Sequence, residues 1–224
     1  MVTGPMTPRP NAPLPENIPI FPLAGALLLP KGQLPLNIFE PRYLRMIDDA
    51  LGGPRLIGMV QPIADPGSDF ADDTGTPPPI FDIGCVGRIT TFSETGDGRY
   101  HIVLTGVSRF GVEREVSSDT PYRMIDADWD RYANDRHKDE TASQIDRELF
   151  LQIMSDYMKE AGLTADWEAA SSASVESLVL SMSLGCPFAP NEKQALLEAP
   201  TVADRADCLM ALMEMAGGAD PMVQ

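Results

Sequence analysis

The chain has 224 residues, 43% of them hydrophobic, and a formal net charge of −16 at pH 7. This length allows one large or two small domains, and the charge opposes binding to nucleic-acid phosphates, which attract clustered Lys and Arg. No run of about 18 apolar residues occurs, so we expect no membrane-spanning segment. Residues 1–17 are rich in proline and lack the apolar core of a secretion signal, so we expect a disordered lead-in there.

Short apolar runs broken by prolines follow the lead-in. Proline donates no hydrogen bond to a sheet, so the runs 18–23 and 27–30 are expected at sheet edges or strand ends. Glu40 and Pro41 predict the start of a helix, and Phe39 just before them is expected to be buried. The helix should bury a stripe at helical spacing and end at two glycines. These residues are Tyr43, Met46, Ile47 and Ala50, followed by Gly52 and Gly53.

The middle of the chain predicts strands. The apolar run 56–60 is a candidate buried strand, and the acidic, proline-rich stretch 64–79 predicts a loop. A turn at 94–98 predicts an antiparallel hairpin between 83–92 and 100–105. Together these segments indicate an antiparallel, meandering sheet.

Two details of these strands carry specific expectations. Gly84 and Gly87 suggest a bulge or a close approach of another chain segment. The alternation over 124–130 predicts a half-buried strand with one apolar face and one solvated, acidic face. The apolar face holds Ile125, Ala127 and Trp129, and the acidic face holds Asp126, Asp128 and Asp130.

The apolar period changes near residue 137 and predicts four helices. The first ends at Gly162 and has an apolar stripe of Ile145, Leu149, Ile153 and Tyr157, which Phe150, Met154 and Met158 widen. The others cover 175–182, 190–198 and a segment that begins at Thr201 as N-cap, with Asp204 in the capping-box position.

Strands followed by helices predict an α+β chain. We expect a β-rich half over 18–133, a helical half over 134–217 and a tail over 218–224. The polar stretch 131–139 is the expected linker. Three widely spaced cysteines without a secretion signal favour reduced thiols and a cytoplasmic location.

The segment 18–43 resembles the opening of the substrate-binding (N-terminal) domain of Lon proteases. The residues that carry the resemblance are Phe21, Pro22, Leu23, Pro35, Leu36, Ile38, Phe39, Glu40, Pro41, Arg42 and Tyr43. Weaker matches at 81–89, 102–110 and 192–198 extend it over about residues 18–215. The resemblance implies a PUA-like pseudo-barrel followed by an α-helical bundle, with these signature residues mainly structural.

The same resemblance implies non-catalytic binding of unfolded or exposed hydrophobic polypeptide segments, as an adaptor or quality-control factor beside a protease. It implies a standalone form, because the sequence lacks the ATPase and peptidase modules that follow this domain in Lon proteases. An extended segment would add to a sheet edge or lie in a groove between the two halves. PUA-like folds also leave open a small-ligand or nucleic-acid-binding module.

Chemistry-bearing motifs are absent from the sequence. It contains no phosphate-binding loop, no G-x-S-x-G nucleophile turn and no Cys or His pair at metal-ligand spacing. We therefore expect no catalytic residue, cofactor or metal, and no enzymatic activity.

Three residues are candidate peptide contacts: Arg42, Arg88 and Met215. The favoured interpretation of the two arginines is a structural ion pair with Glu40 or Asp82, and the alternative is a bidentate contact with a peptide carboxylate. Met215 lies near the end of the last predicted helix and outside its apolar stripe, so it is free to be exposed.

Overall fold

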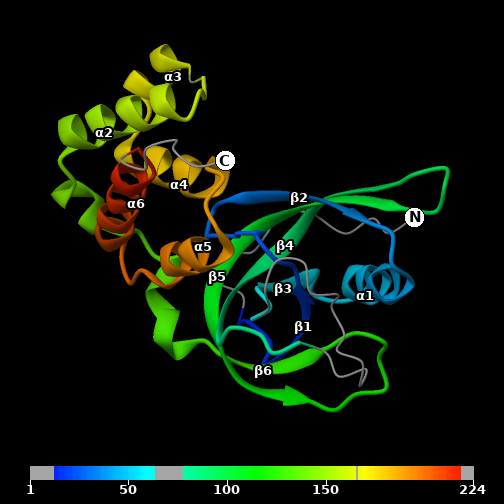
Figure 1. The fold of residues 1–224 in the computed structure, drawn as a ribbon. Helices are drawn as coiled ribbons and strands as arrows, with labels where there is room; N and C mark the ends of the chain where they lie inside the picture. The colour runs from blue at the N-terminus through cyan, green and yellow to red at the C-terminus, as the bar shows by residue number, and fades with distance from the viewer. Residues whose placement is uncertain (1–12, 64–77, 165, 218–224) are drawn as a thin grey trace. The chain divides into compact units, whose positions relative to one another are not determined.

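A computed structural model describes residues 13–63, 78–164 and 166–217 (Figure 1). The expected lead-in up to residue 12, the expected loop between 64 and 77, and the tail 218–224 lie outside the described residues. The chain divides into two compact units between Lys138 and Asp139. No helix among the described residues is long and apolar enough to cross a membrane.

The first unit is a six-stranded sheet in the order β2-β5-β4-β3-β1-β6, in which β5 also pairs with β6. This additional pairing closes five strands into a barrel-like ring and leaves β2 attached to β5 alone. The strands are β1 (Asn17–Pro22), β2 (Gln33–Ile38), β3 (Leu56–Val60), β4 (Ile83–Glu94), β5 (Tyr100–Val116) and β6 (Met124–Asp128). The predicted α+β fold, with a β-rich first part and a helical second part, is confirmed.

Glycines make the tight packing inside the ring possible. A Cβ atom on Gly84 would lie 2.5 Å from the ring of Phe110, and one on Gly87 would lie 2.7 Å from Leu28. The pairing of β4 with β5 also shifts register between Val86 and Gly87. The predicted close approaches and bulge are therefore confirmed.

The prediction of a sheet edge for 18–23 is wrong, whereas the predicted alternative of a strand end holds for Pro22, the last residue of β1. β1 pairs with β6 through Asn17–Pro19 and with β3 through 20–22, so it lies inside the sheet. Pro19 and Pro22 are tolerated because each part of β1 forms a ladder on one side only. The fully buried Ile18 and Ile20 pack in a core cluster with Val86 and Phe110. The second run forms no strand, although Leu27, Leu28 and Leu29 are buried.

The prediction that the acidic face of β6 is solvated is also wrong at Asp126, which is only 3% exposed. Its carboxylate accepts hydrogen bonds from Arg114 Nε of β5 and from the Asn17 side chain of β1. Since the ring closes around β6, neighbouring strands on both sides supply these partners. Alternation within one strand could not reveal them.

Helix α1 (Pro41–Gly52) follows β2 and begins as predicted, with Glu40 as N-cap and Pro41 in the first turn. Tyr43, Met46, Ile47 and Ala50 are all buried. Phe39 is 60% exposed, so its predicted burial is wrong. Ile38 at the end of β2 points into the core, and the next side chain in an extended chain points the opposite way.

The second unit is helical. Its elements are η2 (Thr141–Gln144), α2 (Arg147–Glu160), α3 (Trp167–Ser172), α4 (Val175–Gly185), α5 (Pro190–Glu198) and α6 (Val202–Gly217). The buried stripe of α2 is Phe150, Met154, Tyr157 and Met158. All four belong to the predicted, widened stripe, but Leu149 is 49% exposed, so the buried face is narrower than predicted. The six-residue helix α3 was not predicted.

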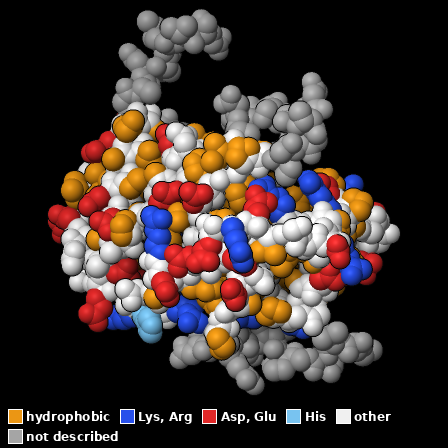
Figure 2. All heavy atoms as spheres, turned by 90° about the horizontal axis from the view of Figure 1, so that it is seen from below, with side chains coloured by type: hydrophobic (Ala, Val, Ile, Leu, Met, Phe, Trp, Pro, Cys, Tyr) orange, Lys and Arg blue, Asp and Glu red, His pale blue; other side chains and the backbone are white. Residues whose placement is uncertain are grey.

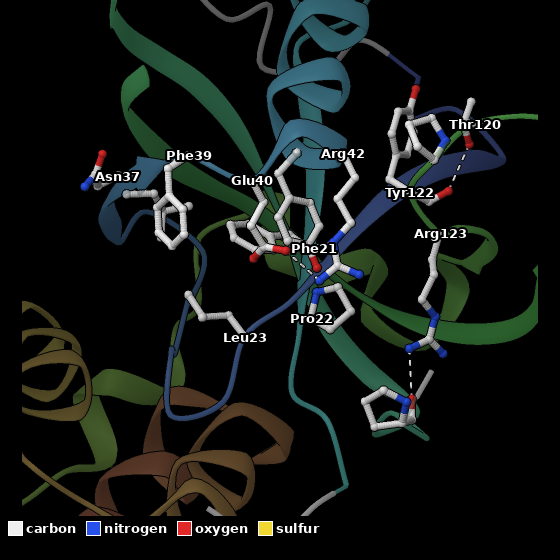
Figure 3. A pocket seen from close by; sticks show the side chains of 14 residues that line it. Phe21, Pro22, Leu23, Asn37, Phe39, Glu40, Arg42, Thr120, Tyr122 and Arg123 are labelled. Atoms are coloured by element: carbon white, nitrogen blue, oxygen red, sulfur yellow. Dashed lines mark hydrogen bonds and ion pairs between the residues drawn. The ribbon is translucent and has the colours of Figure 1, made fainter. Parts of the chain in front are cut away.

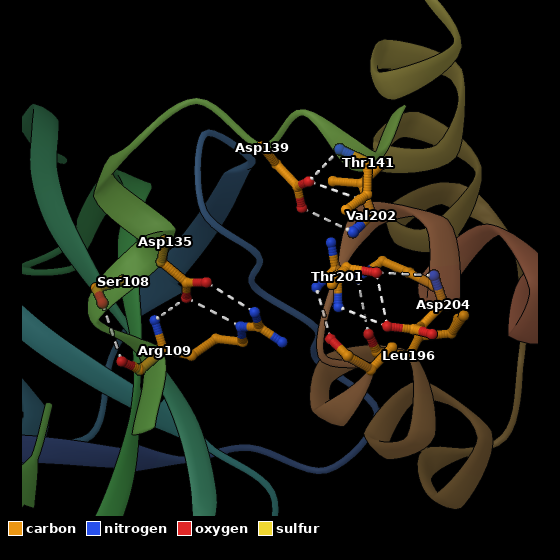
Figure 4. A network of polar contacts seen from close by, with 11 residues as sticks. Ser108, Arg109, Asp135, Asp139, Thr141, Leu196, Thr201, Val202 and Asp204 are labelled. Atoms are coloured by element: carbon orange, nitrogen blue, oxygen red, sulfur yellow. Dashed lines mark hydrogen bonds and ion pairs between the residues drawn. The ribbon is translucent and has the colours of Figure 1, made fainter. Parts of the chain in front are cut away.

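Polar side chains hold the starts and ends of these helices (Figure 4). Thr201 and Asp204 exchange the predicted capping hydrogen bonds, with Thr201 Oγ1 accepting from the Asp204 N–H at 3.1 Å. Asp139 accepts from the Val202 N–H at 2.9 Å, at the first turn of α6. The buried Arg205 donates to the carbonyl of Leu196 at 2.8 Å, near the end of α5.

A second polar contact in Figure 4 belongs to the first unit. The expected linker contains η1 (Asp130–Arg136), which packs on β5. Arg109 of β5 forms a buried ion pair with Asp135 of η1 at 2.7 Å, and its guanidinium lies 4.1 Å from the centroid of the Tyr132 ring. Most of the expected linker is therefore fixed to the barrel.

Candidate functional site

A pocket of about 510 Å³ opens in the first unit (Figure 3). Pro78 and residues from four other places in the chain line it. These places are the end of β1 with Phe21 and Leu23, the end of β2 with Leu36 and Phe39, the start of α1, and the segment 120–123 before β6. The pairing of Pro19 with Met124 brings the first and last of these segments together.

The lining is mostly apolar and aromatic. The rings of Phe21 and Tyr43 lie 4.2 Å apart between centroids, and the Arg42 guanidinium lies 4.6 Å from the centroid of Tyr43. Burial raises the pKa of Tyr43, so its hydroxyl stays protonated at neutral pH. Phe39 presents its exposed ring at the pocket, with the Arg99 guanidinium 5.9 Å away. Such a surface favours apolar side chains over charged ones.

Tyr122 forms part of the opposite wall and is held by α1. Its hydroxyl donates to Asp49 Oδ2 at 2.9 Å, and the same oxygen accepts from Arg45 Nε at 2.9 Å. Burial and the hydrogen bond to Asp49 raise the pKa of Tyr122 to about 12. The hydrogen bonds from Arg45 and Tyr122 hold the pKa of Asp49 below its usual value. The side chain of Tyr122 is therefore neutral, and the ion pair between Arg45 and Asp49 holds it in place.

Both arginines that line the pocket have carboxylate partners, and Figure 3 shows the pair of Arg42 with Glu40. The predicted ion pair between Arg42 and Glu40 is confirmed, with 2.8 Å between Nη2 and Oε2. Arg123 pairs with Glu115 and also donates to the carbonyl of Pro78 at 2.9 Å. The pocket therefore has an apolar lining, and its two arginines are neutralised by Glu40 and Glu115.

The structure separates the three candidate peptide contacts. Arg42 lines the pocket, but Arg88 does not. Arg88 donates to the Pro54 carbonyl at 2.6 Å rather than pairing with Asp82, and burial together with the nearby Arg55 lowers its pKa. Met215 is 70% exposed on α6, in the other unit.

The signature residues come together at this pocket. All of them line it except Pro35, Ile38 and Pro41. The sequence analysis missed Pro78 and the segment 120–123, including Tyr122 and Arg123. No local motif marks these residues, because strand pairing and the closed ring place them beside β1.

Groups suited to metal or redox chemistry do not gather elsewhere in residues 13–63, 78–164 and 166–217. No cluster of three or more His, Cys, Asp or Glu side chains there could hold a metal ion. Cys85, Cys186 and Cys208 form no disulfide in the described residues, and the first two are buried. We take this pocket as the candidate binding site.

Known proteins share this fold and sequence pattern. The family model for the ATP-dependent protease La (LON) substrate-binding domain matches residues 17–215. A Lon protease of Flavobacterium johnsoniae is 28% identical over 205 residues, which cover 88% of this chain and 24% of the relative. Lon protease 2 of Sorangium cellulosum is 32% identical over 126 residues, which cover 54% of this chain and 15% of the relative. The chain thus spans a quarter or less of these relatives.

Solved structures show the same fold. The Lon N-terminal domain protein from Xanthomonas campestris has a TM-score of 0.58 and 21% identity, over 87% of this chain and 97% of that one. The N-terminal domain of the Mycobacterium avium complex Lon protease has a TM-score of 0.63 and 13% identity, over 88% of this chain and 98% of that one. At these identities the likeness concerns the fold alone.

Proposed function

Because the chain belongs to the Lon substrate-binding domain family, we propose that it recognises unfolded or exposed hydrophobic polypeptide segments without chemical catalysis. The observation that carries this proposal is the aromatic-lined pocket with the exposed ring of Phe39 at its mouth. An apolar side chain of a client would be buried against Phe21, Leu36 and Tyr43. Burial of aliphatic and aromatic side chains stabilises such complexes more than any other single contribution.

The proposal extends to a role in protein quality control. A module that binds exposed apolar segments suits an adaptor that delivers clients to a protease, in a cytoplasmic setting. Affinity for each segment should be modest, because ordering a flexible client opposes binding. Arg42 would contact the client as half of a neutral ion pair with Glu40, rather than as a lone cation.

A small-molecule ligand is a second candidate. The pocket volume of about 510 Å³ lies within the range of ligand pockets. A small ligand would be enclosed within the pocket, whereas a polypeptide would extend beyond it across Phe39. Saturable binding of an unfolded protein that depends on Phe39 would favour the polypeptide.

The test is a titration of one labelled, permanently unfolded protein against the whole chain and three variants. Phe39→Ala should weaken binding about 5- to 30-fold, equivalent to about 1–2 kcal/mol. Leu149→Ala and Met215→Ala remove exposed apolar side chains from the helical unit and should leave the affinity unchanged. Met215→Ala also tests the expected groove between the halves, because a loss equal to that of Phe39→Ala would place the client on both units. Equal affinity of all four proteins would contradict the pocket as the site.

A further inference from the structure

Every arginine around the pocket already has a carboxylate partner. Arg42 and Arg123 line the pocket, Arg45 reaches the lining residue Tyr122 through Asp49, and Arg99 lies against the ring of Phe39. The pairs are Arg42–Glu40 at 2.8 Å, Arg45–Asp49 at 2.9 Å, Arg99–Asp97 at 3.1 Å, and Arg123–Glu115 with 2.9 Å between Nε and Oε2. A client carboxylate would therefore have to displace a partner already in place.

Two carboxylates beside the pocket have no cation within ion-pair distance in the described part of the chain. Asp119 precedes the lining residue Thr120, and Asp48 precedes Asp49, to which Tyr122 donates. Both side chains are exposed. Asp48 accepts a hydrogen bond from the Tyr100 hydroxyl at 3.0 Å but forms no ion pair with a described residue. We call Asp48 and Asp119 the acidic rim.

The charge of the whole chain has the same sign as the acidic rim. The formal net charge is −16, and on the face drawn in Figure 2 most blue side chains lie beside red ones. A surface potential of one sign attracts segments of the opposite charge and speeds their encounter. Like charges brought together oppose association.

We propose that the pocket selects apolar segments that carry Lys or Arg within a few residues of the buried side chain, and that it discriminates against segments flanked by Asp or Glu. This inference rests on the proposed function, since the apolar residue is the anchor and the basic residue adds specificity. An extended chain advances about 3.3 Å per residue. A basic residue two to four positions from the anchor would thus lie about 7–13 Å from it along the client, and Asp119 directly precedes the lining residue Thr120.

Three labelled peptides test the preference. They share one apolar core with a central phenylalanine and differ only in two flanking residues on each side, which are Lys, Ser or Asp. At 20 mM NaCl the Lys-flanked peptide should bind about three- to tenfold more tightly than the Ser-flanked one, and the Asp-flanked peptide should bind most weakly. The differences should shrink at 200 mM NaCl, because salt screens exposed charges.

Two charge-matched double variants assign the preference to the acidic rim. Asp48→Asn with Asp119→Asn should bring the affinity for the Lys-flanked peptide close to that for the Ser-flanked peptide. Glu160→Gln with Glu168→Gln removes two exposed carboxylates from the helical unit and should preserve most of the difference. Equal losses in the two double variants would overturn the assignment to the rim, because total charge would then explain the preference.

Failure of the inference is distinguishable from failure of the proposed function. If the three peptides bind equally and Phe39→Ala weakens all of them, the charge preference is wrong and the apolar site stands. If no peptide binds and Phe39→Ala leaves binding of the unfolded protein unchanged, both proposals are wrong.

Discussion

Phe39 and Phe110 show how differently two phenylalanines can act in one unit. Phe39 is 60% exposed at the pocket, whereas Phe110 is fully buried in the barrel core and packs against Trp129 with 5.8 Å between ring centroids. We expect Phe110→Ala to lower the free energy of unfolding by about 3–5 kcal/mol. Phe39→Ala should lower it by no more than about 0.5 kcal/mol, because little packing is lost at an exposed site.

Denaturant titration of both variants beside the unchanged protein measures this difference. A loss of about 3 kcal/mol or more for Phe39→Ala would mean that the ring is part of the core. The predicted burial of Phe39 would then be correct.

The ion pair between Arg109 and Asp135 is buried, whereas the pair between Arg45 and Asp49 is exposed. The side chains of Arg109 and Asp135 are 4% and 8% exposed, while Arg45 in its pair with Asp49 is 65% exposed. Asp135→Ala should destabilise the protein by about 3–5 kcal/mol, since it removes the carboxylate that faces a buried guanidinium. Arg45→Ala should lower the free energy of unfolding by less than about 1 kcal/mol. Thermal unfolding of the two variants tests this, and equal shifts in Tm would refute the role of burial.

At the scale of elements, β5 depends on a glycine at its centre. A Cβ atom on Gly106 would lie 2.0 Å from the carbonyl oxygen of Leu29, and backbone there cannot move aside easily. Hydrogen bonds from Lys31 to Gly106 and from Gly106 to Gly32, each 2.9 Å long, hold this crossing together. Gly106→Ala should therefore lower the free energy of unfolding by at least about 3 kcal/mol, which is the upper end of the usual cost of overpacking.

The matched control is Gly96→Ala. A Cβ atom on Gly96 would meet nothing within 4 Å, and its backbone is not in the left-handed region. Its free energy of unfolding should stay within about 0.5 kcal/mol of the unchanged protein. Similar losses for the two variants in denaturant titrations would show that the crossing at Gly106 can relax.

The start of α6 should make stability depend on pH through Asp139. Partial burial opposes ionisation of Asp139, but hydrogen bonds from Thr141 and from the Val202 N–H outweigh it and hold the pKa of this carboxyl below its usual value. A lowered folded-state pKa stabilises the fold above the unfolded-state pKa of about 3.9, and this stabilisation is lost as pH falls through the folded-state pKa. Asp139→Asn should lower Tm at pH 7, and the difference should shrink as the pH falls below the unfolded-state pKa of about 3.9. A difference independent of pH would exclude the charge as its cause.

The sequence predicted elements with strong local signals and missed those decided by packing. Pro41 and Pro190 begin α1 and α5 at the predicted residues, and Thr201 with Asp204 caps α6 as predicted. In α2, by contrast, the predicted apolar stripe is broader than the buried face, and packing against α6 decides which of its residues are buried. Trp167–Ser172 is too short to show a period of its own.

At the scale of the whole molecule, the pocket could be predicted only in part. Resemblance to the family selected the residues of 21–43, because they are contiguous in sequence. Tyr122 and Arg123 reach the pocket through pairing between strands about a hundred residues apart, and a single sequence does not reveal such pairing. The ring closure that removed β1 from the sheet edge is equally non-local.

The net charge predicts behaviour toward nucleic acid. With a formal charge of −16 and four arginines around the pocket already in ion pairs, affinity for RNA should be weak and should vanish with added salt. Fluorescence anisotropy of a labelled RNA oligonucleotide at 150 mM NaCl measures it. Submicromolar, sequence-selective binding would contradict this expectation and favour the nucleic-acid-binding alternative.

The pairing of β1 with β6 has a consequence for folding during synthesis. Asn17 and Asp126 pair across 109 positions of the chain. Ribosomes add about 5–20 residues per second, so β1 waits on the order of 5–20 seconds before the strand that closes the ring has been made. Until then the apolar side chains of Ile18, Ile20 and Phe21 lack part of their final surroundings. A nascent chain of this kind is itself an exposed hydrophobic segment, and chaperones acting at the ribosome would meet it before its own barrel closes.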